Sequence, residues 1–187
     1  MSRAIGNNHY RVTALAGRRP DEINAEVVRF PLDNIIAVRE QIKQLFSKQR
    51  FTHLVCAAAC GADLLALDVA TDLDVECHII LPFEPSEFLL ASVTDRPGGW
   101  KQLYDRLIIA AEKSDNLYLL GYSRDDDEAF SKTTKAIVAH AKKLANGKPA
   151  SAIVVWEGQS RGNDDATEEF AILSRNEGLH TVEIITV

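Results

Sequence analysis

Short runs of apolar and β-branched residues alternate along the chain with longer segments in which apolar residues recur at helical spacing. The pattern predicts strands at residues 11–16, 52–56, 75–81, 116–120, 152–156 and 181–185. Helices are expected at 33–47, 64–69, 85–92, 100–114, 125–144 and 164–176. Such alternation is typical of βα units. We expect one α/β domain over residues 1–187, a Rossmann-like three-layer sandwich with a mostly parallel central sheet flanked by helices.

The composition is that of an ordinary globular domain, because 46% of the 187 residues are hydrophobic and 26% are charged. The formal net charge of −6 argues against general binding of nucleic acid, which needs a clustered basic face. No apolar run approaches the roughly 18 residues that cross a bilayer, and the first ten residues lack the apolar middle of a signal peptide. These features predict a cytoplasmic protein that contacts neither membrane nor nucleic acid.

Three cysteines, at positions 56, 60 and 77, lie in segments that we expect to be buried. An odd number gives no complete disulfide framework, which agrees with a reducing compartment. Cys56 and Cys60 could be combined with His53 or His78 as metal ligands, but the C-x-x-C spacing is missing. We therefore predict no metal site and no cofactor.

Glycine-containing turns follow the first, second and fifth predicted strands, at Gly17, Gly61 and Gly158. In a parallel sheet all of these turns lie at the carboxyl ends of the strands, where the following helices also begin. Glycine lets a ligand approach the backbone closely. The turns predict a common crevice able to hold a small anion.

The turn after the second strand, residues 57–63, is the sharpest example. Ala59 and Gly61 precede a helix, and the N–H groups of Gly61, Ala62 and Asp63 could surround a phosphate. The alternative is a tight connection in which Asp63 caps the first turn.

Arg18 and Arg19 follow the glycine of the first strand, and either guanidinium group could bind phosphate oxygens or an internal acid. A solvated surface pair is the alternative. We expect one of the two to point inward.

The connection after the fifth strand carries Gly158, Gly162, Asp164 and Thr167. A carboxylate there would repel a phosphate but suits a ribose hydroxyl or a bridging metal ion. The alternative role of Asp164 is to cap the last helix.

Acidic residues also follow the third strand, where Phe83 precedes Glu84 and Glu87. An acid there could bind a sugar hydroxyl or act as a base, although capping of a short helix is the plainer interpretation.

Four segments occur in the order and spacing of a known superfamily: Ala16-Gly17-Arg18-Arg19-Pro20, residues 57–66, Leu81-Pro82-Phe83-Glu84-Pro85 and Trp156-Glu157-Gly158. Together they resemble the SLOG superfamily of Rossmann-like domains, which groups the DNA-processing protein DprA with the LOG phosphoribohydrolases. The resemblance covers nearly the whole chain. It implies a nucleotide-derived ligand in the crevice, and some relatives are sensors while others cleave an N-glycosidic bond.

The chain departs from the enzymatic branch in two places. The P-G-G-x-G-T-x-x-E signature of the LOG enzymes is replaced by Gly162-Asn163-Asp164-Asp165-Ala166-Thr167, and Ala57 stands where many relatives have glycine. No Gly-x-Ser-x-Gly elbow, P-loop or G-x-G-x-x-G run occurs either.

The leading hypothesis is a sensor domain in signalling that binds a nucleotide or sugar phosphate. Its contacts would be Gly17, Arg18, Gly61, Ala62 and Asp63 on one side and Gly158, Gly162, Asp164 and Thr167 on the other. The further predicted ligand contacts are Arg19, Ala59, Phe83 and Glu84. One alternative is a nucleoside monophosphate hydrolase that uses Glu84, Glu87 or Asp164. Another is an interaction module that forms a homodimer through the helix at 100–114, with an effector domain elsewhere in a longer chain.

Overall fold

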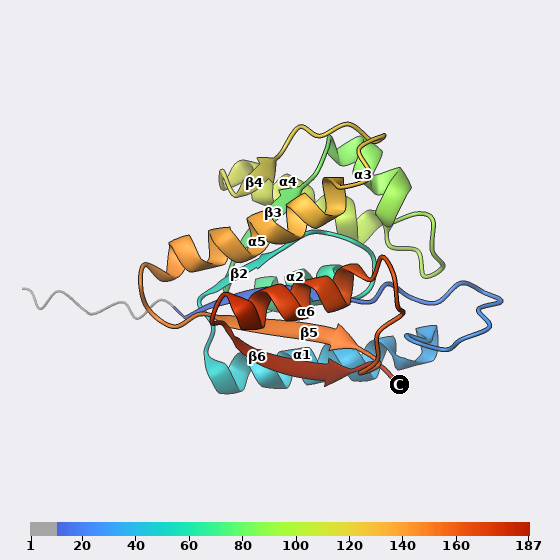
Figure 1. The fold of residues 1–187 in the computed structure, drawn as a ribbon, viewed down its shortest axis with the longest axis horizontal. Helices are drawn as coiled ribbons and strands as arrows, with labels where there is room; N and C mark the ends of the chain where they lie inside the picture. Colours follow the sequence, from blue (N-terminus) through green and yellow to red (C-terminus); the bar gives the residue numbers. More distant parts are fainter. Residues whose placement is uncertain (1–10) are drawn as a thin grey trace, which may run out of the picture.

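The computed structural model describes residues 11–187. Its six strands form one parallel sheet in the order β4-β3-β2-β1-β5-β6, which confirms the expected fold class (Figure 1). The strands are β1 (Val12–Gly17), β2 (His53–Cys56), β3 (Glu76–Leu81), β4 (Leu117–Leu119), β5 (Ser151–Trp156) and β6 (His180–Ile185). The third strand, β3, lies between β2 and the edge strand β4, and β1 and β2 occupy the middle of the sheet.

Helices cover both faces of the sheet (Figure 1). One layer contains α1 (Ile35–Gln49), α2 (Ala62–Asp72) and α4 (Lys101–Lys113), and α5 (Ala129–Ala145) and α6 (Ala166–Asn176) form the other. The short helix α3 (Pro85–Ser92) follows β3 and packs against α4, and a 3-10 turn, Leu32–Asn34, precedes α1. Among residues 11–187 no helix combines the length and the apolar character that crossing a bilayer requires.

Each helix layer buries its apolar stripe against one face of the sheet. Val38, Ile42 and Phe46 recur every four residues on α1 and face one core, and Ile137, Val138 and Ala141 of α5 face the other. Such spacing places side chains on one side of a helix. The helix at 100–114, considered above as a dimerisation surface, corresponds to α4, and its apolar residues Leu107 and Ile108 lie in the core.

Two helix starts differ from the predicted ones. The acidic residues 125–128 form turns before α5, which begins at Ala129. Helix α6 begins at Ala166, and its capping residue is Asp165 instead of Asp164. The Asp165 side chain accepts hydrogen bonds from the amides of Thr167 and Glu168, whereas Asp164 is exposed with a φ of 60°.

The topology reverses between β1 and β5, since the chain winds from β1 toward β4 and then returns to β5 and β6. Open α/β sheets bind ligands in the crevice outside the carboxyl ends of the strands at such a point. The candidate site is therefore sought where β1, β2 and β5 end.

Candidate functional site

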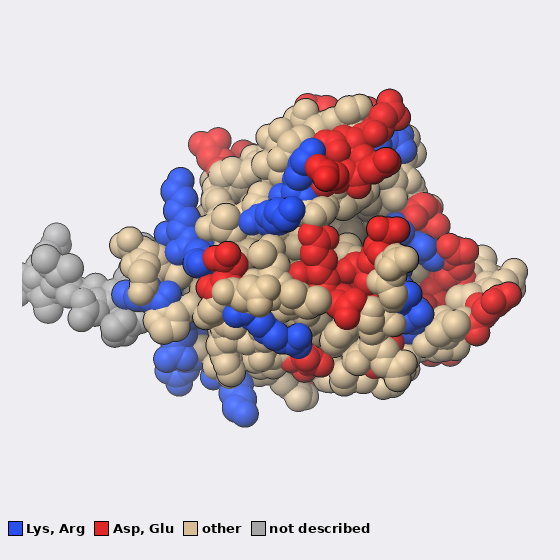
Figure 2. All heavy atoms as spheres, viewed as in Figure 1, with Lys and Arg blue, Asp and Glu red and all other residues tan. Residues whose placement is uncertain are grey.

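A pocket of about 460 Å³ opens at the carboxyl ends of β1 and β2. Ligand pockets of proteins typically enclose about 300–1,000 Å³. Leu15, Ala16 and Ala57 belong to its lining at the strand ends, and further walls come from α3, α5 and the start of α6. Figure 2 shows a hollow between the beginnings of α5 and α6, with acidic side chains around it.

Of the residues predicted to bind ligand, six line this pocket: Gly17, Arg18, Arg19, Ala59, Asp63 and Thr167. The remaining seven lie outside its lining: Gly61, Ala62, Phe83, Glu84, Gly158, Gly162 and Asp164.

Gly17 and Gly61 allow the end of β1 and the loop after it to approach the start of α2 and β5 closely. A Cβ on Gly17 would lie 2.5 Å from both the Ala62 Cβ and the Val155 carbonyl oxygen. A Cβ on Gly61, whose φ is +90°, would lie 2.7 Å from the Arg18 carbonyl oxygen. The two glycines therefore serve close packing between protein segments, whereas the turn pattern had assigned them to the close approach of a ligand.

Protein groups already form hydrogen bonds at the start of α2. The Ala62 amide donates to the Arg18 carbonyl oxygen at 3.2 Å, and the Asp63 carboxylate accepts from the Ala59 amide at 3.2 Å. A carboxylate thus stands where a phosphate was expected. Burial raises the pKa of Asp63 to about 7, although the Ala59 hydrogen bond and the charge of Arg19 act in the opposite direction.

Arg18 is the inward-pointing arginine, with only 4% of its surface exposed. Its guanidinium group donates to Glu157 at 2.6 Å and to Asp165 at 2.5 and 2.9 Å. It also donates to the Gln159 carbonyl oxygen at 2.8 Å and lies 5.8 Å from the centre of the Trp156 ring. Arg18 therefore joins β1 to the loop after β5 and leaves little capacity for a ligand.

The two acids that pair with Arg18 are held ionised. Burial acts to raise the pKa of Asp165, but hydrogen bonds from Arg18 and from the Arg161 and Glu168 amides hold it well below its usual range. The pKa of Glu157 is also lowered, because its bonds to Arg18 and Arg29 outweigh its burial.

Arg161 is the third arginine beside these two acids, and it lies in the exposed loop between β5 and α6. Its Nε is 3.8 Å from Asp165, whose oxygens already accept from Arg18. Three guanidinium groups, of Arg18, Arg29 and Arg161, thus face two carboxylates, which leaves one positive charge in excess. Burial and the like charge of Arg18 lower the pKa of Arg161, as expected for a cation without a full counter-charge.

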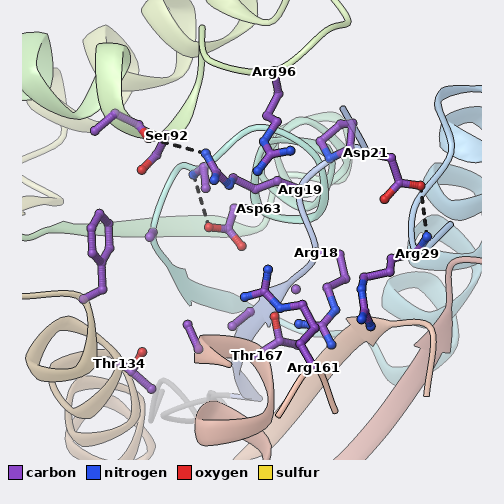
Figure 3. A pocket seen from close by; sticks show the side chains of 18 of the residues that line it. Arg18, Arg19, Asp21, Arg29, Asp63, Ser92, Arg96, Thr134, Arg161 and Thr167 are labelled. Carbon is purple, nitrogen blue, oxygen red and sulfur yellow. Dashed lines mark hydrogen bonds between the residues drawn. The ribbon is translucent and has the colours of Figure 1, made fainter. Parts of the chain in front are cut away.

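Two further arginines lie on the other side of the pocket, with Asp63 between the two groups in the close view (Figure 3). Arg19 pairs with Asp95 at 2.6 Å, and Arg96 pairs with Glu22 at 2.8 Å. The Nε of Arg96 is buried and lies 3.7 Å from the Asp95 carboxylate, without a hydrogen bond within residues 11–187. Buried polar groups are normally hydrogen-bonded, so this donor can bind a further acceptor.

The apolar wall of the pocket includes Phe88 and Phe130. Phe130 lies near the start of α5 and is 45% exposed, and its ring meets that of Phe83 edge to face at 5.9 Å. Phe83, a predicted ligand contact, is therefore buried behind Phe130 and supports it. Two buried threonines of α5, Thr133 and Thr134, complete this wall.

The acids that the hydrolase hypothesis used do not face the pocket. Glu84, Glu87 and Asp164 are all exposed and lie outside its lining. Sequence reasoning also missed several lining residues: Arg29, Arg96, Arg161, Phe88, Phe130, Thr133 and Thr134. Arg161 had a sequence signal, because it lies within the Gly158–Gly162 turn. The other six had none, because they lie in the loops and helices that follow the predicted strands.

No protein-family model and no curated protein matches the chain. Among solved structures, DNA processing protein A (DprA) from Streptococcus pneumoniae is similar in fold, with 14% sequence identity and a TM-score of 0.44. The match covers 92% of this chain and 58% of that one, so the chain spans less than two thirds of the length of DprA.

Proposed function

We propose that the pocket binds a small phosphorylated ligand, a nucleotide or a nucleotide-derived molecule, and that the domain acts as its receptor. The observation that carries the proposal is the surplus guanidinium charge of Arg161 in the wall of a pocket of ligand size. A guanidinium group binds phosphate oxygens through charge-assisted hydrogen bonds. The buried Nε of Arg96, which makes no hydrogen bond within residues 11–187, supplies a second donor across the same pocket.

Phe130 supports the choice of a nucleotide over a simple sugar phosphate. Its half-exposed ring lines the same pocket as Arg161 and is backed by Phe83. A base stacks on an aromatic face with little sequence preference, and each such contact contributes about 1–3 kcal/mol. We therefore assign the phosphate to Arg161 and the base to Phe130.

The acidic surroundings of the pocket favour a small anion over a polyanion. The carboxylates of residues 125–128 gather on the loop before α5, above the hollow in Figure 2. A long nucleic acid would bring many phosphates against these carboxylates, whereas a mononucleotide enters past them.

Calorimetric titration of the purified chain tests the proposal with inorganic phosphate, ribose 5-phosphate, AMP and adenosine. We expect AMP to bind best. Arg161→Gln should weaken the binding of AMP and ribose 5-phosphate about tenfold, the worth of one charge-assisted hydrogen bond. Phe130→Ala should weaken AMP and leave ribose 5-phosphate unchanged.

Arg175→Gln is the matched control. Arg175 lies in the last turn of the same helix that Arg161 precedes, and it forms an exposed ion pair with Glu183 at 3.0 Å. The control removes the same charge far from the pocket and should leave every affinity unchanged. Absence of binding by all four compounds, or equal losses in Arg161→Gln and Arg175→Gln, would contradict the proposal.

One observation favours a second candidate, hydrolysis of a nucleoside monophosphate. Asp63 lines the pocket, and burial raises its pKa to about 7, the range of a general base at neutral pH. Asp63 would take a proton from the water that attacks C1′ of the ribose, the bond between C1′ and the base would break, and the departing base would take up a proton to leave as free base. Chromatography for free base after incubation with AMP tests this candidate. Asp63→Asn should abolish any release of base. Absence of release by the wild-type chain would rule out hydrolysis.

A further inference from the structure

A second group of polar side chains lies at the opposite edge of the sheet, where β2 and β3 begin. His53 is the first residue of β2, Glu76 is the first of β3, and His78 follows two residues later. The parallel register sets His53 opposite Glu76 and Val55 opposite His78. Because side chains alternate along a strand, all three point to the same face of the sheet, the one covered by α5.

The three side chains meet at the spacing of metal ligands. The Nε2 atom of His53 lies 3.4 Å from one Glu76 oxygen, and the Nε2 atom of His78 lies 3.3 Å from the other. One ligand atom of each residue lies within 4.8 Å of the other two. Tetrahedral Zn²⁺ with bonds of about 2.0–2.1 Å separates its ligand atoms by about 3.3–3.4 Å. The backbone therefore already holds these groups at nearly the required distance.

Neighbouring groups orient both imidazole rings. The Thr52 hydroxyl lies 2.9 Å from Nδ1 of His53, and the Tyr118 hydroxyl lies 3.2 Å from Nδ1 of His78. In both rings Nε2 is left facing Glu76. Metal-binding histidines are held in this way, through a hydrogen bond at the nitrogen that does not bind the metal.

Glu76 is oriented as well, because the Asn116 amide donates to its Oε1 at 3.2 Å. The Glu76 side chain is 50% exposed, so an ion can reach it from solvent. The cluster is thus rigid on its protein side and open on its solvent side.

The Nε2 atom of His78 is a buried atom without a hydrogen-bond partner in the described part of the chain. His78 itself is only 4% exposed. That nitrogen lies 3.3 Å from the Glu76 carboxylate, and an ion between the two groups would bind a buried atom that makes no hydrogen bond within the described residues.

The donor set is two imidazole nitrogens and a carboxylate. Cys77 stands between Glu76 and His78 but points to the other face, where its Sγ lies 4.0 Å from the Leu67 carbonyl oxygen of α2. Imidazole donors suit zinc and related transition metals, whereas calcium and magnesium prefer oxygen ligands.

We propose that His53, Glu76 and His78 form a Zn²⁺ site at the amino ends of β2 and β3, with the fourth position open to water. The proposal revises the expectation of no metal site, which considered cysteine spacing. It is independent of the nucleotide pocket, which lies at the carboxyl ends of the strands. A bound ion would link β2 to β3 and stabilise the native state, because ligands that bind only the folded chain do so.

Titration of the EDTA-treated, dialysed chain with ZnCl₂ tests the site by calorimetry and by thermal unfolding. We expect one Zn²⁺ per chain and a rise in Tm. Glu76→Gln and His53→Gln should each lower the affinity at least tenfold, while His180→Gln should not. His180 is the matched control, an exposed histidine that begins β6 at the same edge of the sheet.

Co²⁺ as a spectroscopic probe identifies the ligands. We expect the visible absorption of four-coordinate Co²⁺ without a strong near-ultraviolet thiolate band, since no sulfur belongs to the site. Circular dichroism of the metal-free variants separates lost ligands from lost folding. The proposal is overturned by absence of Zn²⁺ binding, by a thiolate band, or by equal affinities in the wild-type chain and a folded Glu76→Gln variant.

Discussion

At the scale of single residues, the pocket is marked by charged side chains that are buried and paired with one another. Arg18, Glu157 and Asp165 satisfy one another, so that an arginine predicted to bind ligand serves instead to hold the loop after β5. The sequence could predict that one arginine points inward, because it follows a buried strand. It could not reveal the partners, since Asp165 lies 147 positions away and competes with the adjacent Asp164 for the capping position.

Asp63 should make stability depend on pH. Its pKa is about 7 in the fold and about 3.8 when the side chain is exposed in the unfolded chain, so the folded chain holds an extra proton between these values. The contribution of Asp63 to stability therefore falls as pH rises from about 4 to about 7. Asp63→Asn should stabilise the chain on the order of 3 kcal/mol at pH 8 and much less at pH 5. Urea denaturation at both values measures this, and an equal effect at both would contradict it.

At the scale of elements, hydrophobic period was sufficient to predict every strand and α-helix described in residues 11–187, because each carries its own apolar stripe or run. Hydrophobic period does not determine where each helix begins and ends. The acidic residues 125–128 suit a first helical turn by charge, yet α5 begins only at Ala129. Helix starts depend on which residue supplies the cap, and local charge alone does not decide that.

Two glycines test how the start of α2 is fitted to β1. Gly61 and Gly162 have nearly the same φ, +90° and +89°, but only a Cβ on Gly61 would meet neighbouring atoms, at 2.7 and 2.8 Å. Gly162→Ala should cost about 1 kcal/mol for the left-handed backbone alone. Gly61→Ala should lower the free energy of unfolding by roughly 2 kcal/mol more, because the start of α2 and the loop after β1 must move apart. Equal losses in chemical denaturation would show that the close approach at Gly61 is unimportant.

At the scale of the whole molecule, strand order determines which residues meet. Periodicity predicts six parallel strands, but their order places β1 and β2 in the centre and brings Arg29, Arg96 and Arg161 from three separate loops to one pocket. The same register sets His53 beside Glu76 and His78. Neither group could be predicted from spacing along the chain, because each depends on which strands are neighbours.

The pocket at the carboxyl edge is the central claim, and an NMR titration of the ¹⁵N-labelled chain with AMP tests it most directly. We predict saturable shifts in the amides of Gly17, Arg161 and Thr167, which line the pocket or belong to its loops. The amides of His53 and His180, at the amino ends of their strands, should not move. Unchanged spectra at millimolar AMP, or shifts confined to the amino edge, would contradict the account.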